Sequence, residues 1–265
     1  MNKIKLPCPA KLNLNLTVLR KKIDGMHEIN SQFQLINLFD EMKIEKTTSK
    51  LINVSTNIYP SIDGEKNIVY QAISELSNYI GRQVYCNISI KKNIPLGSGL
   101  GGGSSNAAAA LIGVNVLFEL GLSSKDLITI GKKVGADVPF FIFGKNAHAS
   151  GTGDILIKAK SPSEKKYLLL FPQIHSSTKE LFFQWDKLST DYQNKILRNE
   201  KNSFLSPDVS PLPPSTFHFP PISINWAPSS TQLCLSCDGI SQFFKLKVTV
   251  LSPCGSSLGQ RNGNK

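Results

Sequence analysis

The sequence predicts an α+β fold, because strand-like and helix-like apolar patterns both occur along one globular chain. Some segments alternate apolar and polar residues, which is typical of a strand with one buried face, and others space apolar residues three or four apart, which is typical of a helix. The chain has 265 residues, of which 40% are hydrophobic and 18% charged. This length allows one large domain or two ordinary ones.

Strands are expected where apolar residues alternate with polar ones or run together. Residues 11–18 alternate cleanly, with three leucines and a valine on one face and with Lys11 and Asn13 on the opposite, polar face. Further strands are expected at residues 33–44, 85–90, 138–143 and 167–171.

Three helices are expected from helical spacing combined with start and stop residues. They are residues 67–80, ended by Gly81; residues 104–120, capped by Ser104 or Ser105; and a segment that is capped by Ser123 and ends near Gly135. A serine hydroxyl suits these starts because it accepts a hydrogen bond from an unpaired N–H group of the first turn.

The stretch IPLGSGLGGGSS, residues 94–105, predicts a phosphate-binding loop. Five of the seven residues from Gly97 to Gly103 are glycine, which lets the backbone approach an anion closely. The expected strand before the loop and helix after it would present unpaired N–H groups and the positive end of a helix dipole. Hydroxyls of Ser104 and Ser105 could contact phosphate or magnesium.

Three alternative roles for the glycine stretch have weaker support. The P-loop pattern fails because no lysine follows the glycines. A dinucleotide pattern GxGxxG matches at Gly97, Gly99 and Gly102, but the chain-wide strand–helix alternation that should accompany it is absent. A flexible linker would rarely run straight into a capped amphipathic helix.

Charge favours an anionic partner, since 30 Lys and Arg residues against 19 Asp and Glu give a net charge of +11. The basic residues are scattered, which argues against nucleic acid. The sequence contains no apolar stretch of about 18 residues, so no membrane helix is expected. Pro7, Pro9 and Lys11 interrupt any signal-peptide core near the N-terminus. A cytoplasmic protein is expected.

The five cysteines do not indicate a disulfide framework, because their number is odd and their spacing irregular. Cys234 and Cys237 form a single CxxC pair without the further ligands that a zinc site needs. No residue is predicted as a metal ligand on these grounds.

Three separated stretches resemble the GHMP kinases in the expected order. They are PAKLNLNL at residues 9–16 with DGMHEI at 24–29, PLGSGLGGGSSNAA at 95–108, and GADVPFFIFGKNAHASGTGD at 135–154. The resemblance covers about residues 1–200. It implies an N-terminal ATP-binding domain like ribosomal protein S5, a ferredoxin-like C-terminal domain, and phosphorylation of a small-molecule hydroxyl by ATP with Mg2+.

Within the family, the stretches are most similar to members that phosphorylate the 2-hydroxyl of a cytidine diphosphate methylerythritol in isoprenoid precursor synthesis. The resemblance implies that Asp137 is the catalytic base and that Lys11 keeps it ionised, with Asn13 as a second polar contact. The residues that would bind the nucleotide are Asn67, Lys92, Pro95, Gly97, Gly99, Leu100, Gly101, Gly102, Gly103, Ser104 and Ser105.

The same resemblance implies a cytosine pocket. His27 would hydrogen-bond the base, and Met26 stands where the family commonly has a stacking tyrosine. Phe182 would cover the other side of the ring, and Thr178 would contact the substrate. Alternatives are another small-molecule kinase of the family, such as a homoserine kinase, or a nucleotide-binding remnant without activity.

The segment after about residue 203 departs from the family. It holds 8 of the 15 prolines, and LCLSCDGIS at residues 233–241 stands where a third glycine-rich segment is expected. We therefore expect an ATP-binding domain at 1–155, the start of a C-terminal domain at 156–202, and an atypical tail at 203–265. A shift of reading frame would explain this tail and would leave the second domain incomplete; the alternative is real divergence.

Overall fold

The computed structural model describes residues 1–160, 167–171, 178–187, 223–224, 235–236 and 247–251. The chain divides into two compact units. Unit 1 comprises Met1–Leu168 with Val250–Lys265, and unit 2 comprises Leu169–Thr249.

Unit 1 is built on a six-stranded sheet in which β3, β4, β2, β5 and β6 are neighbours in that order and β1 pairs with β2. The strands are β1 (Lys3–Lys21), β2 (His27–Lys46), β3 (Ile52–Thr56), β4 (Cys86–Lys91), β5 (Ala147–Ser150) and β6 (Ile155–Lys158). All neighbouring pairs are antiparallel except β3 with β4.

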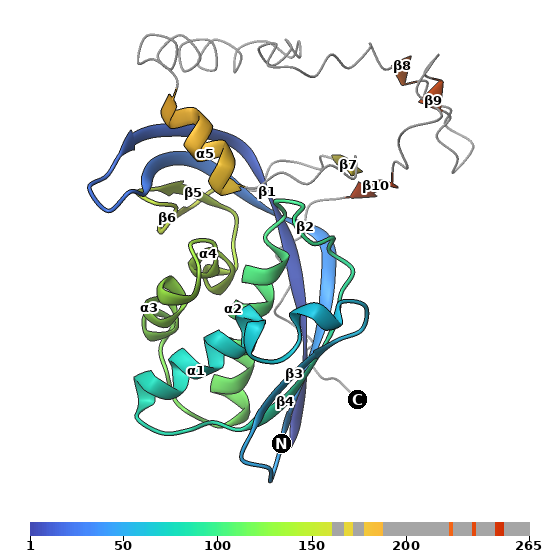
Figure 1. The fold of residues 1–265 in the computed structure, drawn as a ribbon, viewed down its shortest axis with the longest axis vertical. Coiled ribbons are helices and arrows are strands. Elements are labelled where there is room, and N and C mark those ends of the chain that lie inside the picture. Colours follow the sequence, from blue (N-terminus) through green and yellow to red (C-terminus); the bar gives the residue numbers. More distant parts are fainter. Residues whose placement is uncertain (161–166, 172–177, 188–222, 225–234, 237–246, 252–265) are drawn as a thin grey trace, which may run out of the picture. The chain divides into compact units, whose positions relative to one another are not determined.

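The helices of unit 1 lie together on one side of this sheet (Figure 1). They are the short 3-10 turns η1 (Pro60–Ile62) and η2 (Gly64–Lys66) and the α-helices α1 (Ile68–Ile80), α2 (Gly102–Leu117), α3 (Ser124–Val134) and α4 (Val138–Phe143). The core forms where α1 and α2 pack on the inner face of β2 and β4, with side chains such as Ile44, Ile73, Ile88 and Leu111 buried. A Cβ atom at Gly113 would lie 2.5 Å from Leu6 Cδ1, so α2 can approach β1 this closely only with glycine there.

The remaining described elements are β7 (Tyr167–Phe171), α5 (Thr178–Lys187), β8 (Ser223–Ile224), β9 (Leu235–Ser236) and β10 (Lys247–Leu251). β7 pairs with β10, and β8 pairs with β9. Most of the predicted tail at 203–265 lies outside the described residues.

The structure confirms most of the expected elements. Strands cover 11–18, 33–44, most of 85–90 and 167–171, and helices cover most of 67–80 and 104–120. The third helix begins after Ser123, whose hydroxyl accepts from the Asp126 N–H while the Asp126 carboxylate accepts from the Ser123 N–H.

The expectation of a strand at 138–143 is wrong, because this segment is helix α4. A run of six apolar residues cannot distinguish a buried strand from a buried helix. Pro139 in the first turn and Gly144, left-handed at φ 67°, then suit the start and the end of a helix.

Two further expectations are corrected. Helix α2 begins at Gly102 with Gly101 as its N-cap, so Ser104 and Ser105 lie inside the helix rather than capping it. Lys11, expected on an exposed face, is buried, and Leu16 is exposed. Register shifts of β1 against β2 between Pro9 and Ala10 and between Asn13 and Leu16 break the simple alternation.

Candidate active site

The glycine-rich segment forms the loop between β4 and α2, and a cavity of about 230 Å³ opens on it. The cavity is lined by Ile68, Lys92, Pro95, Leu96, Gly97, Ser98, Gly99, Leu100, Gly101, Gly102, Gly103 and Ser104. These include nine of the predicted nucleotide-binding residues, while Asn67 and Ser105 are not among the lining residues.

The loop backbone requires glycine at specific positions. Gly97, Gly99 and Gly101 have φ angles of 66°, 72° and 71°, in the left-handed region that side chains disfavour. A Cβ atom at Gly101 would also lie 2.8 Å from the Phe141 ring, and one at Gly102 would lie 2.9 Å from Ile94. The loop therefore lies directly against its neighbours, with its backbone as the surface of the cavity.

The first turn of α2 supplies donors and a hydroxyl at the same place. The first N–H groups of a helix lack partners within the helix. The Ser105 hydroxyl is buried and has no hydrogen-bond partner among the described residues. A Cβ atom at Gly135 would lie 3.9 Å from Ser104 Oγ, so this turn is close to the segment that carries Asp137.

Lys11 and Asp137 form an ion pair beside the loop. Lys11 Nζ lies 3.2 Å from Asp137 Oδ2 and donates to Asn13 Oδ1 at 2.7 Å. The backbone N–H of Lys11 donates to Leu100 O at 2.9 Å, which fixes β1 to the loop. The ammonium also lies 4.7 Å from the centroid of the Phe33 ring.

The two charges of this pair differ in exposure. The Lys11 side chain is 5% exposed and that of Asp137 is 34% exposed. The structure therefore brings together the two predicted catalytic residues and Asn13, with the carboxylate as the accessible member of the pair.

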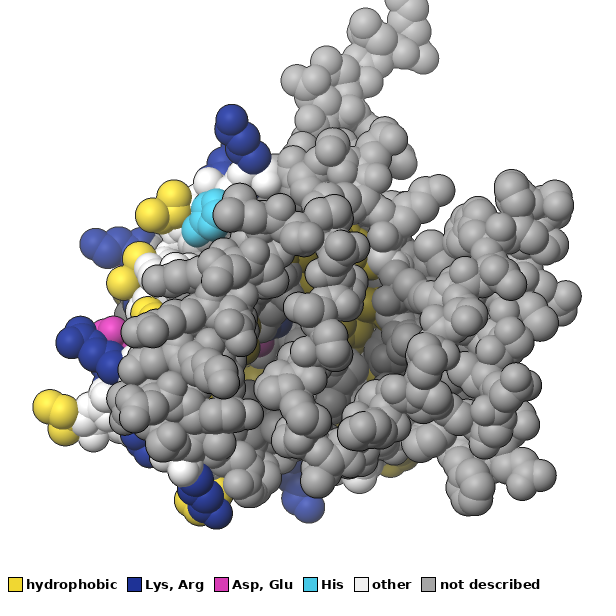
Figure 2. Space-filling model, turned by 90° about the horizontal axis from the view of Figure 1, so that it is seen from above, with side chains coloured by type: hydrophobic (Ala, Val, Ile, Leu, Met, Phe, Trp, Pro, Cys, Tyr) yellow, Lys and Arg dark blue, Asp and Glu magenta, His cyan; other side chains and the backbone are white. Residues whose placement is uncertain are grey.

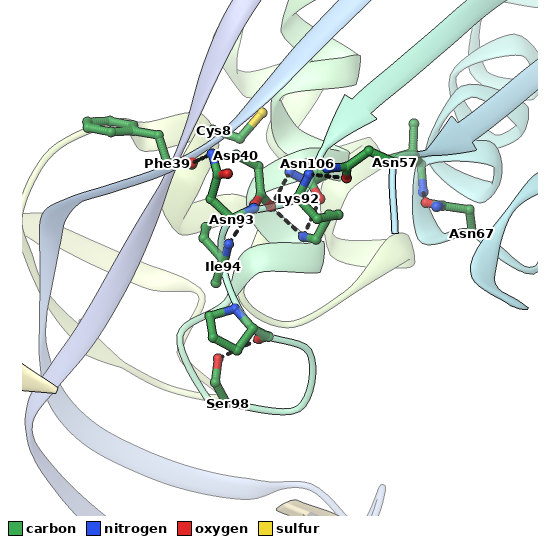
Figure 3. Close-up of polar contacts among 12 residues, drawn as sticks. Cys8, Phe39, Asp40, Asn57, Asn67, Lys92, Asn93, Ile94, Ser98 and Asn106 are labelled. Carbon is green, nitrogen blue, oxygen red and sulfur yellow. Dashed lines mark hydrogen bonds and ion pairs between the residues drawn. The ribbon is translucent and has the colours of Figure 1, made fainter. Parts of the chain in front are cut away.

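A second charged group beside the loop escaped the sequence analysis. Asp40 of β2 pairs with Lys92, and both are buried together with Asn106 of α2 (Figure 3). The adjacent carboxylates Asp40 and Glu41 inside the apolar segment 33–44 were the signal in the sequence that could have indicated it.

Asn67 has a structural partner of its own. Its side chain accepts from the Val69 N–H at 2.9 Å and caps α1. It precedes Ile68, which lines the cavity, so its position is adjacent to the predicted nucleotide site.

Met26 and His27 lie at the turn between β1 and β2. Met26 is 47% exposed, whereas His27 is buried. The Met26 N–H donates to Asp24 Oδ1 at 3.0 Å, and this hydrogen bond lowers the pKa of the Asp24 carboxyl. Lys11 pairs with Leu35 across the β1–β2 ladder. His27 lies eight residues before Leu35 on β2, so at most about 28 Å of strand separates the two.

Thr178 and Phe182 lie on α5 of unit 2. Phe182 is partly buried. Their predicted contacts with the substrate stay predictions.

Neither a cluster of metal ligands nor, on the face drawn in Figure 2, a basic patch stands out among the described residues. The described part of the chain contains no group of three or more His, Cys, Asp or Glu that could hold a metal ion. On the face in Figure 2, described Lys and Arg side chains lie at separate places along the edge rather than in one patch. None of the helices within the described ranges has the length and apolar character to cross a membrane.

The sequence is similar to a family domain and to kinases of known name. Residues 67–145 match the GHMP kinases N terminal domain. The chain is 42% identical over 182 residues to 4-diphosphocytidyl-2-C-methyl-D-erythritol kinase of Haemophilus ducreyi, covering 69% of this chain and 64% of that protein. It is 41% identical over 217 residues to the kinase of the same name from Citrifermentans bemidjiense, covering 80% and 78%.

Solved structures of kinases are similar to this fold. A crystal structure of 4-(cytidine 5'-diphospho)-2C-methyl-D-erythritol kinase matches with a TM-score of 0.57 and 31% identity over 68% of this chain and 63% of that one. Homoserine kinase from Cytophaga hutchinsonii shares the fold, with a TM-score of 0.54 and 20% identity over 68% of this chain and 59% of that one. The chain thus spans less than two thirds of the length of several curated relatives. The fold, the glycine loop and these likenesses together show that the chain belongs to the GHMP kinase family.

Proposed function

We propose that this protein transfers the γ-phosphoryl group of ATP to the 2-hydroxyl of 4-diphosphocytidyl-2-C-methyl-D-erythritol, in the cytoplasm, as a step of isoprenoid precursor synthesis. The observation that carries this proposal is the Lys11–Asp137 ion pair, which the Lys11 N–H ties to the glycine loop at Leu100. It sets a carboxylate beside an anion cradle, as transfer from ATP to a hydroxyl requires. The names of the similar kinases supply the acceptor.

The loop and the start of α2 hold the nucleotide. Backbone N–H groups of the loop donate to phosphate oxygens, and Lys92 reaches the nucleotide from the end of β4. Ser104 lines the cavity, so its hydroxyl is available to a phosphate oxygen or to magnesium. The buried Ser105 hydroxyl beside it has no partner among the described residues.

Magnesium fits the donors present. It takes oxygen ligands, commonly one or two carboxylates together with substrate phosphates, and Ser104 and Asp137 would offer a hydroxyl and a carboxylate. When bound with ATP, magnesium neutralises charge on the phosphates.

Asp137 acts on the acceptor. Its carboxylate orients the hydroxyl and takes its proton as the hydroxyl oxygen bonds to the γ-phosphorus and ADP leaves. Lys11 compensates the carboxylate charge and fixes its direction, because its own ammonium is held by Asn13 and by the Phe33 ring. Phosphoryl transfer depends chiefly on alignment and charge stabilisation, so few residues are needed.

The cytosine end of the substrate lies toward the β1–β2 turn. His27 donates to or accepts from the base edge, and Met26 packs a thioether on the ring where a tyrosine would stack. Phe182 and Thr178 of α5 are proposed as further substrate contacts. A long cytidine diphosphate substrate suits a hairpin that carries Lys11 on β1 and His27 at the start of β2. The hairpin of β1 and β2 is bent along its length (Figure 1).

The chain's organisation remains a proposal. We propose an ATP-binding domain at 1–155, the start of a ferredoxin-like domain at 156–202, and an aberrant tail at 203–265 that arises from a shifted reading frame. Resequencing the gene across codons 195–215 tests this. An intact frame that encodes the same tail would contradict the frameshift.

The decisive experiment is ADP release by the purified chain with magnesium and ATP, with and without the methylerythritol substrate. Substrate-dependent release that Asp137→Ala abolishes supports the proposal. ADP release with homoserine in place of the methylerythritol substrate would indicate a different small-molecule kinase of the family. Homoserine is the test substrate because this chain shares its fold with a homoserine kinase. Bound ATP without release would indicate a nucleotide-binding remnant, a candidate because the tail departs from the family.

A further inference from the structure

A buried carboxylate beside the glycine loop has no part in the reaction described above. Asp40 is fully buried on β2. Its partners are the N–H groups of Asn93 and Ile94, at 2.7 and 2.8 Å, Asn106 Nδ2 at 3.0 Å, and Lys92 Nζ (Figure 3). A buried carboxylate is tolerated only when it is paired and hydrogen-bonded, and all of these partners lie on or beside the loop.

One oxygen of Asp40 accepts hydrogen bonds from the backbone at the point where the chain leaves β4. The ladder between β2 and β4 ends at the pair Glu41 and Lys91. Beyond this point Asp40 Oδ1 accepts from both the Asn93 and the Ile94 N–H. Because the loop follows directly at Pro95, this oxygen sets the direction in which the backbone enters the cavity.

The other oxygen of Asp40 holds an ammonium at the cavity. Lys92 Nζ contacts Asp40 Oδ2 and donates to Asn106 Oδ1 at 2.9 Å. It would lie 3.3 Å from a Cβ atom on Gly102, so it sits against the first residue of α2. An ammonium has three N–H donors, and these contacts use two of them.

The position of the buried Lys92 ammonium depends on the negative charge of Asp40. The side chains of Lys92 and Asp40 are 3% and 0% exposed. Removing one partner of a buried pair leaves an uncompensated charge, which is strongly unfavourable. The long lysine stem would then turn toward water and leave the cavity wall.

We infer that Asp40 is a positioning residue for the nucleotide: it holds the Lys92 ammonium and the start of the glycine loop in the geometry that binds ATP. This inference rests on the proposed function, since it takes ATP as the ligand of the cavity. Asp40 acts through Lys92 and the loop and does not itself touch the substrate.

The test is a double-mutant cycle on ATP binding, measured by calorimetry without the acceptor. Asp40→Asn keeps the size and the Oδ1 acceptor but removes the charge, and Lys92→Met removes the ammonium. Each should weaken ATP binding by about tenfold or more, the usual worth of a charged hydrogen bond. The double variant should bind no more weakly than Lys92→Met alone, because Asp40→Asn keeps the Oδ1 acceptor for the loop and removes only the hold on Lys92.

Thermal unfolding of the same variants separates positioning from stability. Asp40→Asn should lower Tm, and the double variant should regain part of it, because no buried ammonium is left unpaired. A positioning role predicts that ATP affinity stays low in the double variant although stability recovers. Affinity that recovers together with Tm would mean that Asp40 is merely structural and would overturn the inference.

Glu41→Gln is the matched control. Glu41 follows Asp40 on β2 and pairs with Lys91 at 2.8 Å, but both of these side chains are exposed. ATP affinity should be unchanged in this variant. If Asp40→Asn fails to fold, Asn106→Ala replaces it, because it removes a hydrogen-bond partner from both Asp40 Oδ2 and Lys92 Nζ and so loosens the pair.

Further results of the ATP-binding measurements bear on the role of Asp40 or on the proposed function. A folded Asp40→Asn, or in its place Asn106→Ala, that binds ATP within about twofold of wild type overturns the inference, because the expected loss is about tenfold or more. Additive losses in the double variant would do the same. Intact ATP binding without turnover of the methylerythritol substrate would contradict the proposed function alone, whereas a wild-type chain that binds no ATP overturns both.

Discussion

Lys11 Nζ lies 3.2 Å from Asp137 Oδ2, with the lysine almost fully buried and the aspartate one third exposed. The pair joins the first strand of the chain to the turn before α4, and the Lys11 N–H extends the connection to the glycine loop at Leu100. Because the buried partner is the cation, the carboxylate is the group that an incoming hydroxyl would meet.

Asp137→Asn should lower kcat by about 100- to 10,000-fold, the usual contribution of a general base. The amide keeps the shape but cannot take the hydroxyl proton, so ATP binding should be unchanged. Steady-state ADP release and ATP calorimetry check this. Glu75→Gln, which alters an ion pair with Lys133 on α3, is a control with normal kcat. A near-normal kcat in Asp137→Asn would assign the base elsewhere.

Lys11→Met should reduce kcat by about 100-fold or more, the scale on which one preorganised electrostatic group contributes. The variant keeps an apolar stem against Phe33, so the far-UV circular dichroism should stay normal. Lys43→Met removes an exposed lysine paired with Glu45 at 2.8 Å and should leave kcat unchanged. Equal kcat values for the two variants would remove Lys11 from the mechanism.

Gly101→Ala should destabilise the protein more than Gly99→Ala. Both glycines have left-handed backbones, so each substitution costs about 1–2 kcal/mol of unfolding free energy. A Cβ at Gly101 meets Phe141 at 2.8 Å, whereas one at Gly99 meets nothing within 4 Å. Overpacking should add about 1–3 kcal/mol at Gly101. Urea unfolding measures the difference, and equal costs would contradict the loop geometry.

Ser123→Ala should lower the unfolding free energy by about 1 kcal/mol, the typical loss of an N-cap. Ser124→Ala, one residue into α3, is the matched control with little expected effect. The Ser123 hydroxyl donates to Asp126 Oδ2 at 2.6 Å and, with Tyr79 as the next cause, lowers the pKa of Asp126.

A carboxyl whose pKa is lower in the folded chain stabilises it above the carboxyl's ordinary pKa, and the gain is lost as pH falls through the folded value. The Ser123→Ala difference should therefore shrink in acid. Urea unfolding at neutral pH and at about pH 3, near the ordinary pKa of Asp, measures it. A difference that grows in acid would contradict the capping box.

Cys8 and Cys86 should resist alkylation in the folded chain. Burial raises the pKa of each thiol to about 12. At pH 8 only about one thiol in ten thousand would then be the reactive thiolate. Iodoacetamide labelling followed by peptide mass spectrometry measures each site separately, with the urea-unfolded chain as the control. Rapid labelling of either cysteine under native conditions would show that its surroundings open readily.

The sequence alone determined the features that depend on neighbouring residues. Period-two alternation marked the strand at 11–18, the glycine run marked the loop before α2, and Ser123 marked the start of α3. These signals are local, because strand pleating, glycine backbone freedom and helix capping each act within a few residues.

Only the tertiary structure decided which side chains meet. Lys11 is buried because it meets Leu100 of the glycine loop, the Phe33 ring and Asp137, which come from distant parts of the chain, and no alternation pattern could indicate this. The segment 138–143 is ambiguous by itself, and its neighbours and the glycine after it made it helix α4. The contacts of Lys11 with Asp137 and of Asp40 with Lys92 join residues far apart in the chain, so their geometry exists only once the sheet and α2 have packed together.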